Sequence, residues 1–353
     1  MTKIQTALVT GGAGFIGSHV VEHLVRANCQ VINLDLLTYA GNLRNLSAVA
    51  DKPGHRFVRG DICDGRLVGE LIAAHAPDTI FNVAAETHVD RSIDDAAAFM
   101  RTNIEGTYRL LEASLAYWRG LPEERRATFR FIQMSTDEVY GSIAVGQFTE
   151  TSNYAPNSPY AASKAAGDHL VRAYHITYGL PTVIVHASNT YGPRQYPEKL
   201  IPHMVLTAIS GDPLPVYGEG KNVRDWMYVD DLADGLMRVV KQGAAGEIYN
   251  FAGGNERQNI ETVRLICREL KRLAPAPHDY DELIAFVTDR PGHDMRYAMS
   301  FDKVRRELGW RPTSDFEEGV ARTVAWYLDN GVWCQALLEH GYEGVRLGTA
   351  QKL

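Results

Sequence analysis

A strand-like run at residues 7–10 leads directly into a glycine-rich turn at 11–17, and this junction constrains the fold more than any other part of the sequence. The apolar residues that follow recur at helical spacing, so the turn joins a strand to a helix. Glycines let the backbone turn tightly and approach a pyrophosphate, whose charge is met by free N–H groups at the helix N-terminus. Asp35 closes the next strand-like run, where a carboxylate can bind ribose hydroxyls. These features predict a dinucleotide-binding unit.

Short runs rich in β-forming residues alternate with helix-period segments through the first half of the chain. The runs are 7–10, 30–34, 56–59, 79–83, 130–134 and 182–186. Strands separated by helices need crossover connections, which produce a parallel sheet. The sequence therefore predicts an α/β fold, a doubly wound parallel (Rossmann-type) sheet with a second, smaller C-terminal substrate domain. We expect the first unit to span 1–187, rejoined by about 225–252, and the second to span mainly 188–353.

Charge, hydropathy and cysteine content restrict the functional classes. Lys and Arg number 36 against 43 Asp and Glu, which gives a net charge of −7 and no basic field for nucleic acid or an anionic membrane. No uninterrupted apolar run is long enough to span a bilayer, and the N-terminus lacks the pattern of a secretory signal. The four cysteines lie far apart without metal-ligand spacing, so we expect reduced thiols, no metal site and a cytoplasmic protein.

Two adjacent acids, Asp137 and Glu138, follow the β-rich run 130–134 after two hydroxyl residues. Neighbouring side chains on a strand point to opposite sides, so both acids can serve one cleft only where the strand ends and the backbone turns. One carboxyl group could then protonate a leaving group while the other removes a carbon-bound proton, which is the chemistry of an elimination. An N-cap or turn acid beside a solvated neighbour is the alternative that these two residues leave open.

Tyr160 and Lys164 lie four residues apart near the start of a helix predicted at 159–178, after the N-cap signal Ser158-Pro159. This spacing places the phenol beside the ammonium group. The cation and the helix N-terminus should lower the pKa of Tyr160 toward working pH, so that the phenol can act as a base. An ordinary surface pair is the alternative, but the nucleotide-binding turn earlier in the chain favours the catalytic interpretation.

The cofactor expected at the glycine-rich turn is NAD. Asp35 would repel the 2′-phosphate of NADP, and no Arg follows it directly. Asp61 and Ile62 follow the third strand-like run, where they could position the adenine or form a surface turn. Two small residues, Ala84 and Ala85, end the fourth run, where a bulky side chain would crowd a dinucleotide.

Six segments carry a resemblance to a known family. They are 37–42 (LTYAGN), 88–93 (HVDRSI), 135–141 (STDEVYG), 197–202 (PEKLIP), 224–226 (RDW) and 289–294 (DRPGHD). Together with the glycine-rich turn and the Tyr160/Lys164 pair, these segments resemble the extended short-chain dehydrogenase/reductases, and within them most closely the dTDP-glucose 4,6-dehydratases. The resemblance spans nearly the whole chain.

The resemblance implies an internal redox cycle on a nucleotide sugar. Tyr160, aided by Thr136 and Lys164, would take the proton of the 4-hydroxyl while the C4 hydride passes to NAD. The resulting C4 carbonyl would acidify the C5 hydrogen. Glu138 would then remove that proton while Asp137 protonates the departing 6-hydroxyl, and the hydride would return to C6.

The residue patterns and the resemblance together give three sets of site residues. The catalytic residues are Thr136, Asp137, Glu138, Tyr160 and Lys164. The cofactor would contact Gly11, Gly14, Phe15, Ile16, Gly17, Asp35, Thr38, Asp61, Ile62, Ala84, Ala85, Thr102, Tyr160 and Lys164. The nucleotide-diphosphate hexose would contact Glu86, His88, Asn189, Lys199, Leu200, Tyr217, Arg224, Asn259, Arg290, His293 and Tyr297. The resemblance also implies a homodimer, formed through helices near 99–118 and 159–178.

Several residues differ from those that are common at the same positions in this family, and these differences leave the identity of the substrate open. Leu36 stands where a lysine commonly follows the ribose acid, and Thr190 and the pair Arg194-Gln195 change a loop expected near the sugar and diphosphate. A UDP- or CDP-hexose 4,6-dehydratase, a 4-epimerase and a decarboxylase are therefore alternatives, although the last two need no acid for a 6-hydroxyl. A non-catalytic NAD-binding module is a further alternative, which would predict loss of the Tyr/Lys pair or the acid pair.

Overall fold

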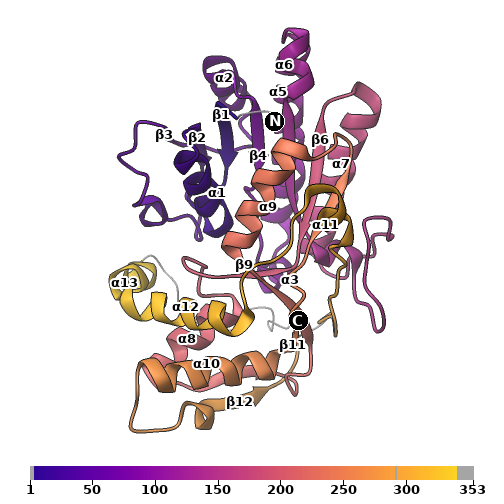
Figure 1. Ribbon diagram of the computed structural model, residues 1–353. Coiled ribbons are helices and arrows are strands. Elements are labelled where there is room, and N and C mark those ends of the chain that lie inside the picture. Colours follow the sequence, from indigo (N-terminus) through magenta and orange to yellow (C-terminus); the bar gives the residue numbers. More distant parts are fainter. Residues whose placement is uncertain (1–3, 291, 340–353) are drawn as a thin grey trace.

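A seven-stranded, fully parallel sheet forms the larger part of the protein, in the order β10-β6-β5-β4-β1-β2-β3. The computed structural model describes residues 4–290 and 292–339. The strands of this sheet are β1 (Thr6–Thr10), β2 (Gln30–Asp35), β3 (His55–Arg59), β4 (Thr79–Asn82), β5 (Arg130–Thr136), β6 (Thr182–Ala187) and β10 (Ile248–Phe251). All six predicted strands are present, and the predicted doubly wound parallel sheet is confirmed (Figure 1).

Helices cover both faces of this sheet. One layer contains α1 (Phe15–Arg26) and α9 (Val229–Gln242), and the other contains α2 (Gly65–His75), α5 (Thr107–Arg119) and α7 (Pro159–Tyr178). Successive residues of a strand point to opposite faces, so Leu8 and Val9 of β1 belong to different hydrophobic clusters. Both faces of the strands are therefore apolar, as a sheet between two helical layers requires.

A second region lies below this sheet in the view of Figure 1 and has its own apolar core. Its strands are β7 (Asn189–Tyr191), β8 (Leu214–Tyr217), β9 (Val223–Tyr228), β11 (Glu256–Gln258) and β12 (Ile284–Val287), which form the sheets β11-β9-β7 and β12-β8. Its helices are α8 (Leu200–Ser210), α10 (Asn259–Leu273), α12 (Phe316–Asp329) and α13 (Gly331–Glu339).

Shorter elements connect the main ones. They are α3 (Val89–Asp94), α4 (Ala97–Phe99), the π-helical η2 (Met100–Gly106), α6 (Glu123–Thr128), α11 (Asp302–Leu308) and the 3-10 turns η1 (Leu43–Leu46), η3 (Asp137–Tyr140) and η4 (Tyr280–Leu283). The predicted helix at 159–178 has those bounds, and its N-cap Ser158 accepts a hydrogen bond from the Ala161 N–H. Among the described residues, no helix combines the length and apolar character needed to cross a membrane.

The chain returns from the second region to the first sheet through α9 and β10. Strand β10 pairs with β6 at the sheet edge, and α9 packs against α1. Gly235 in the middle of α9 lies so close to Phe251 of β10 that an added Cβ would be 2.3 Å from a ring carbon. Trp310 packs edge-on against the same ring, with centroids 4.7 Å apart. A glycine is therefore required where the returning helix crosses the returning strand.

We predict that Gly235→Ala lowers the free energy of unfolding by about 1–3 kcal/mol, because the new methyl group overpacks the contact with Phe251. Gly69→Ala in the middle of α2 is the matched control. Apart from the adjacent backbone of the helix itself, no heavy atom lies within 4 Å of an added Cβ there. That control should gain about 0.5–1 kcal/mol from helix propensity alone. Urea unfolding of the two variants measures both effects, and equal shifts would contradict the packing argument.

Candidate active site

Two adjoining cavities lie at the carboxyl ends of the parallel strands, where open α/β sheets bind ligands. Every residue predicted to contact the cofactor lines the first cavity, as do the predicted catalytic residues. The second cavity is lined by His88, Asn189, Lys199, Leu200, Tyr217, Arg224, Asn259, Arg290, His293 and Tyr297, all predicted for the nucleotide sugar. Glu86, predicted for the same ligand, lines the first cavity instead. Both cavities share Glu138, Asn189, Thr190, Gln195, Glu198 and Lys199, and we call this boundary the seam.

The glycine-rich turn leaves the N-terminus of α1 open toward the first cavity. Gly14 occupies the N-cap position, where no side chain of the described residues caps the helix, so its first N–H groups are available to an anion. Gly11 has a φ of 69°, and a Cβ there would lie 2.6 Å from the Ala84 Cα. A Cβ on Gly17 would lie 2.1 Å from the Gly11 carbonyl oxygen. Both positions exclude any larger residue, and the resulting surface fits a pyrophosphate.

Asp35 is held in a fixed orientation at the end of β2. Its Oδ2 accepts a hydrogen bond from the Ala13 N–H at 2.9 Å, and its Oδ1 accepts one from the Leu37 N–H at 2.8 Å. Asn45 supports the same turn by donating to the Ala13 carbonyl at 2.8 Å. The adjacent Leu36 is 43% exposed and lines the cavity without a positive charge for a 2′-phosphate. This arrangement fits NAD.

Asp61 uses both carboxylate oxygens within the protein. Oδ1 accepts a hydrogen bond from the Cys63 N–H at 2.9 Å, which forms a local turn, and Oδ2 pairs with Arg101 at 2.7 Å. These hydrogen bonds are those expected if Asp61 forms a surface turn, which was the alternative interpretation. Its contact with an adenine stays a prediction, since the residue also lines the first cavity.

The acid pair stands where β5 ends and the backbone turns into η3. Thr136, the last residue of the strand, accepts a hydrogen bond from the Glu138 N–H at 3.2 Å. The same hydroxyl donates to Asp137 Oδ1 at 3.1 Å. Asp137 is only 3% exposed, and its Oδ2 has no partner among the described residues. The turn thus brings both acids to the same cavity and leaves one oxygen of Asp137 free for a ligand.

Burial gives the two acids different protonation behaviour. Desolvation, followed by the charge of Glu138, raises the pKa of Asp137 to about 8, so this carboxyl group holds a proton at neutral pH. Burial also raises the pKa of Glu138, but Arg290 and Lys199 act in the opposite direction by favouring the charged form. The pair therefore combines a proton donor with an acid whose ionised form is stabilised by cations.

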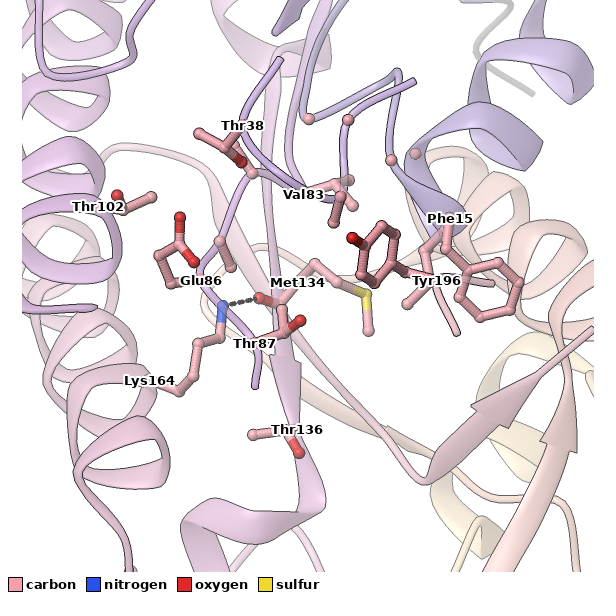
Figure 2. A pocket seen from close by; sticks show the side chains of 18 of the residues that line it. Phe15, Thr38, Val83, Glu86, Thr87, Thr102, Met134, Thr136, Lys164 and Tyr196 are labelled. Carbon is pink, nitrogen blue, oxygen red and sulfur yellow. Dashed lines mark hydrogen bonds between the residues drawn. The ribbon is translucent and has the colours of Figure 1, made fainter. Parts of the chain in front are cut away.

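Tyr160 and Lys164 both lie on α7 and line the first cavity. The ammonium group of Lys164 donates to the Met134 carbonyl at 2.6 Å, as the dashed line in Figure 2 shows, and burial lowers its pKa to about 8. The expected lowering of the Tyr160 pKa is wrong. Burial and the charge of Glu138 raise the pKa of Tyr160, and together they outweigh a hydrogen bond with Thr136.

Cationic groups in the second cavity are anchored by neighbours from the first region. Arg290 pairs with Asp90 of α3, whose other oxygen accepts a hydrogen bond from the Tyr217 hydroxyl at 3.1 Å. Lys199 donates to the Thr87 carbonyl at 2.7 Å. These positive charges fit a diphosphate, which the net acidic protein would otherwise repel.

His88 and His293, two of the histidines that line the second cavity, are neutral at physiological pH. Burial lowers the pKa of His88 to about 3 and that of His293 to about 4. His88 caps α3 by accepting a hydrogen bond from the Arg91 N–H, and His293 contacts Asp289 at 2.6 Å. In the described part of the chain, no group of three His, Cys, Asp or Glu residues is placed to hold a metal ion.

Glu198 is a seam residue that the predicted sets did not include. Its carboxylate is buried and accepts hydrogen bonds from the Tyr39 hydroxyl at 3.0 Å and from Arg91 Nε at 3.4 Å. Burial raises its pKa, and Lys199 is the foremost group acting against that shift. Its position beside Lys199 in the segment 197–202 was the available sequence signal.

The expectation for the loop containing Arg194 is wrong in part. Arg194 lines neither cavity but pairs with Glu22 of α1 and donates to the Asn45 carbonyl at 2.8 Å. The other two departures in that loop, Thr190 and Gln195, do reach the seam. The basic side chain therefore fastens the loop to the first region and contributes no charge to the cavities.

Buried polar atoms without a hydrogen-bond partner gather in these cavities. Among the described residues that line them, these atoms are Asp137 Oδ2, Ser188 Oγ, Asn189 Oδ1, Gln195 Oε1, Trp226 Nε1, Asn259 Oδ1 and Arg290 Nε. Buried polar groups are normally paired, because an unpaired one loses its hydration without compensation. The concentration of unpaired donors and acceptors indicates that a polar ligand completes the site.

Comparisons with known proteins agree with this geometry. A family model described as GDP-mannose 4,6 dehydratase matches residues 8–323. The dTDP-glucose 4,6-dehydratase of Neisseria meningitidis serogroup B is 53% identical, with 99% of this chain and 100% of that protein covered. The crystal structure of DesIV, a dTDP-glucose 4,6-dehydratase from Streptomyces venezuelae with NAD bound, is 45% identical with a TM-score of 0.87, covering 94% of this chain and 100% of that one. A UDP-glucose 4-epimerase from Thermotoga maritima is 29% identical with a TM-score of 0.81, covering 92% and 99%.

We predict that Asp137→Asn raises the free energy of unfolding, and that this gain is about 1–4 kcal/mol larger at pH 8 than at pH 5. A carboxyl group whose pKa rises from 3.8 to about 8 on folding binds its proton more tightly in the folded state, so it reduces stability as the pH rises through that interval. The amide removes this dependence. Urea unfolding at the two pH values measures it, with Asp302→Asn on the exposed face of α11 as the control. An equal gain at both pH values would contradict the raised pKa.

Proposed function

Because the chain belongs to the family described as GDP-mannose 4,6 dehydratase, within the extended short-chain dehydrogenase/reductases, we propose that it is an NAD-dependent lyase acting on dTDP-glucose. Its products would be dTDP-4-keto-6-deoxyglucose and water. The observation that carries this proposal is the acid pair, in which a protonated Asp137 adjoins Glu138 at the boundary of the two cavities. An elimination needs both a proton donor and a proton acceptor at that place.

The first step is oxidation at C4 of the hexose. Tyr160 takes the proton of the 4-hydroxyl, while Thr136 and Lys164 hold the phenol and the nearby backbone of β5 in place. Bound NAD supplies the hydride acceptor and, in its oxidised form, a positive charge that favours the phenolate. The C4 carbonyl that forms draws electrons from C5, which makes the C5 hydrogen acidic.

The second step is loss of water across C5 and C6. Glu138 removes the C5 proton, and Asp137 gives its proton to the departing 6-hydroxyl, so that the C6–O bond breaks and a C5–C6 double bond forms. The hydride taken from C4 then returns to C6, and Glu138 returns a proton to C5. The reaction is redox-neutral overall, since one hydride is removed and one is restored.

Proton balance links Tyr160 to Asp137. After one turnover the phenol has gained the proton of the 4-hydroxyl, and Asp137 has lost the proton that left with water. The Thr136 hydroxyl hydrogen-bonds with both groups, at 3.1 Å from Asp137 Oδ1. We infer that Thr136 carries the returning proton and so resets the site without exchange with bulk solvent.

The nucleotide diphosphate would occupy the second cavity, held by the residues predicted for it. The free Arg290 Nε, Asn189 Oδ1 and Asn259 Oδ1 support this assignment, because each is buried without a partner among the described side chains. A 4-epimerase would use the same oxidation at C4 but would need no protonated acid at C6. The raised pKa of Asp137 therefore favours the dehydratase.

We propose the predicted division into two units, with 1–187 and about 225–252 binding NAD and the remainder of 188–353 binding the nucleotide sugar. Separate apolar cores and the return of β10 to the first sheet support it for the described residues, and 340–353 lie outside them. A cytoplasmic location is supported by the four free cysteines.

A homodimer through α5 and α7 is supported by their exposed apolar residues Tyr108, Ile176 and Tyr178.

The variant Asp137→Asn/Glu138→Gln should bind NAD normally and lose at least about 100-fold in formation of the 4-keto-6-deoxy product. Both proton transfers of the elimination are removed, while the groups that oxidise C4 are retained. Reduced nicotinamide should therefore accumulate on addition of dTDP-glucose. The measurements are absorbance of the reduced cofactor and the alkali-induced absorbance of the keto sugar. Unaltered product formation would refute the assignment.

Two controls separate chemistry from structure in that experiment. Glu123→Gln/Glu124→Gln changes an adjacent acid pair on the exposed helix α6 and should leave turnover unchanged. Tyr160→Phe removes the base of the first step, so it should give neither product nor reduced nicotinamide. Normal transient reduction in the phenylalanine variant would argue against Tyr160 as the base.

The dimer proposal predicts that Ile176→Glu dissociates the protein into monomers. Ile176 on α7 is 67% exposed in one chain, and burying a carboxylate there without a partner would oppose association. Light scattering after gel filtration should give twice 39.2 kDa for the wild type and 39.2 kDa for the variant. Val332→Glu on α13, where Val332 is 70% exposed, should stay dimeric. A monomeric wild type, or the same mass for both variants, would contradict the proposed interface.

A further inference from the structure

Gln195 is a seam residue to which no role has been assigned above. The residue lines both cavities and is only 8% exposed. Residues of the seam lie between the cofactor cavity and the cavity with the phosphate-binding cations. A hexose that joins a nucleotide diphosphate to a reacting nicotinamide has to occupy this boundary, so a polar group there faces the sugar.

The orientation of the Gln195 amide follows from its one hydrogen bond. Nε2 donates to the Thr190 carbonyl oxygen at 2.9 Å. A carbonyl oxygen only accepts, so the nitrogen of the amide has to face Thr190 and the oxygen has to lie on the other side. This Oε1 is buried and has no partner within the described part of the chain. Gln195 therefore presents an unpaired acceptor at the seam.

The backbone around Gln195 is fixed by contacts from three elements. The preceding Arg194 has a φ of 68°, which is unfavourable for a residue with a side chain. Its guanidinium pairs with Glu22 of α1 and donates to the Asn45 carbonyl, which holds this conformation. The Tyr327 hydroxyl of α12 donates to the Gln195 carbonyl at 2.5 Å. The acceptor is thus preorganised.

We propose that Gln195 Oε1 accepts a hydrogen bond from a non-reacting hydroxyl of the hexose, at C2 or C3, and thereby selects the sugar. This inference rests on the proposed function. A diphosphate has no donor at neutral pH, so the phosphate groups of the ligand cannot satisfy Oε1. Glu198 offers a second, charged acceptor at the same seam. Two acceptors match two hydroxyls on neighbouring carbons, and a sugar that lacks one of them leaves an acceptor buried and unpaired.

The test compares binding of dTDP-glucose and dTDP by calorimetry, with NAD bound. The Tyr160→Phe background prevents consumption of the sugar nucleotide. Gln195→Met keeps the length of the side chain but removes the acceptor, together with the Nε2 donor that bonds the Thr190 carbonyl. It should weaken dTDP-glucose about three- to tenfold and leave dTDP and NAD unchanged. Equal weakening of dTDP, weakening of NAD, or unchanged binding of dTDP-glucose would each overturn the proposal.

Deoxy sugars provide a second arm that needs no substitution at Gln195. One of dTDP-2-deoxyglucose and dTDP-3-deoxyglucose should bind more weakly than dTDP-glucose by the same three- to tenfold factor, and Gln195→Met should not weaken that analogue further. Additive losses for both analogues would overturn the inference. If the wild-type protein converts dTDP-glucose and the Gln195→Met variant binds it with unchanged affinity, only this inference is overturned. Wild-type protein that neither binds nor converts dTDP-glucose would overturn the proposed function and the inference together.

Discussion

Burial of ionisable side chains at the carboxyl end of β5 is the constraint on which the rest of the site depends. Desolvation disfavours charge, so it moves the pKa of Asp137 up to about 8 and that of Lys164 down to about 8. Each shift costs folding free energy, which the surrounding structure has to offset. Two hydrogen bonds offset part of that cost: Lys164 donates to the Met134 carbonyl, and the Thr136 hydroxyl donates to Asp137. The same contacts hold the groups in positions suited to proton transfer.

The cofactor half of the site is also supported from the far end of the chain. Trp333 of α13 donates to Asn45 Oδ1 at 2.8 Å, and Asn45 Nδ2 donates to the Ala13 carbonyl. The Ala13 N–H in turn donates to the carboxylate of Asp35. A helix of the second region therefore contacts the turn that orients Asp35, the acid predicted to bind the ribose. The conformation of the nucleotide-binding turn therefore depends on packing between the two regions as well as on the local glycine pattern.

Local patterns were sufficient to predict the framework of this protein. Strand-like runs separated by helices predicted the parallel sheet, and Ser158-Pro159 predicted the start of α7 because a cap is a property of adjacent residues. The orientation of Arg194 could not be predicted in this way, since its partner Glu22 lies 172 residues away in sequence. The direction of the Tyr160 pKa was missed for a similar reason. It depends on burial and on Glu138, which a spacing of four residues does not report.

The acid pair shows how chemically similar neighbours acquire different roles. Asp137 is buried and accepts a hydrogen bond from Thr136, and its burial keeps it protonated. Glu138 faces Arg290 and Lys199, and both cations belong to segments beyond β6 that build the second cavity. Removing those cations would leave two buried acids with raised pKa values and no distinct base. The proposed donor and acceptor of the elimination are therefore distinguished only when the two regions meet around them.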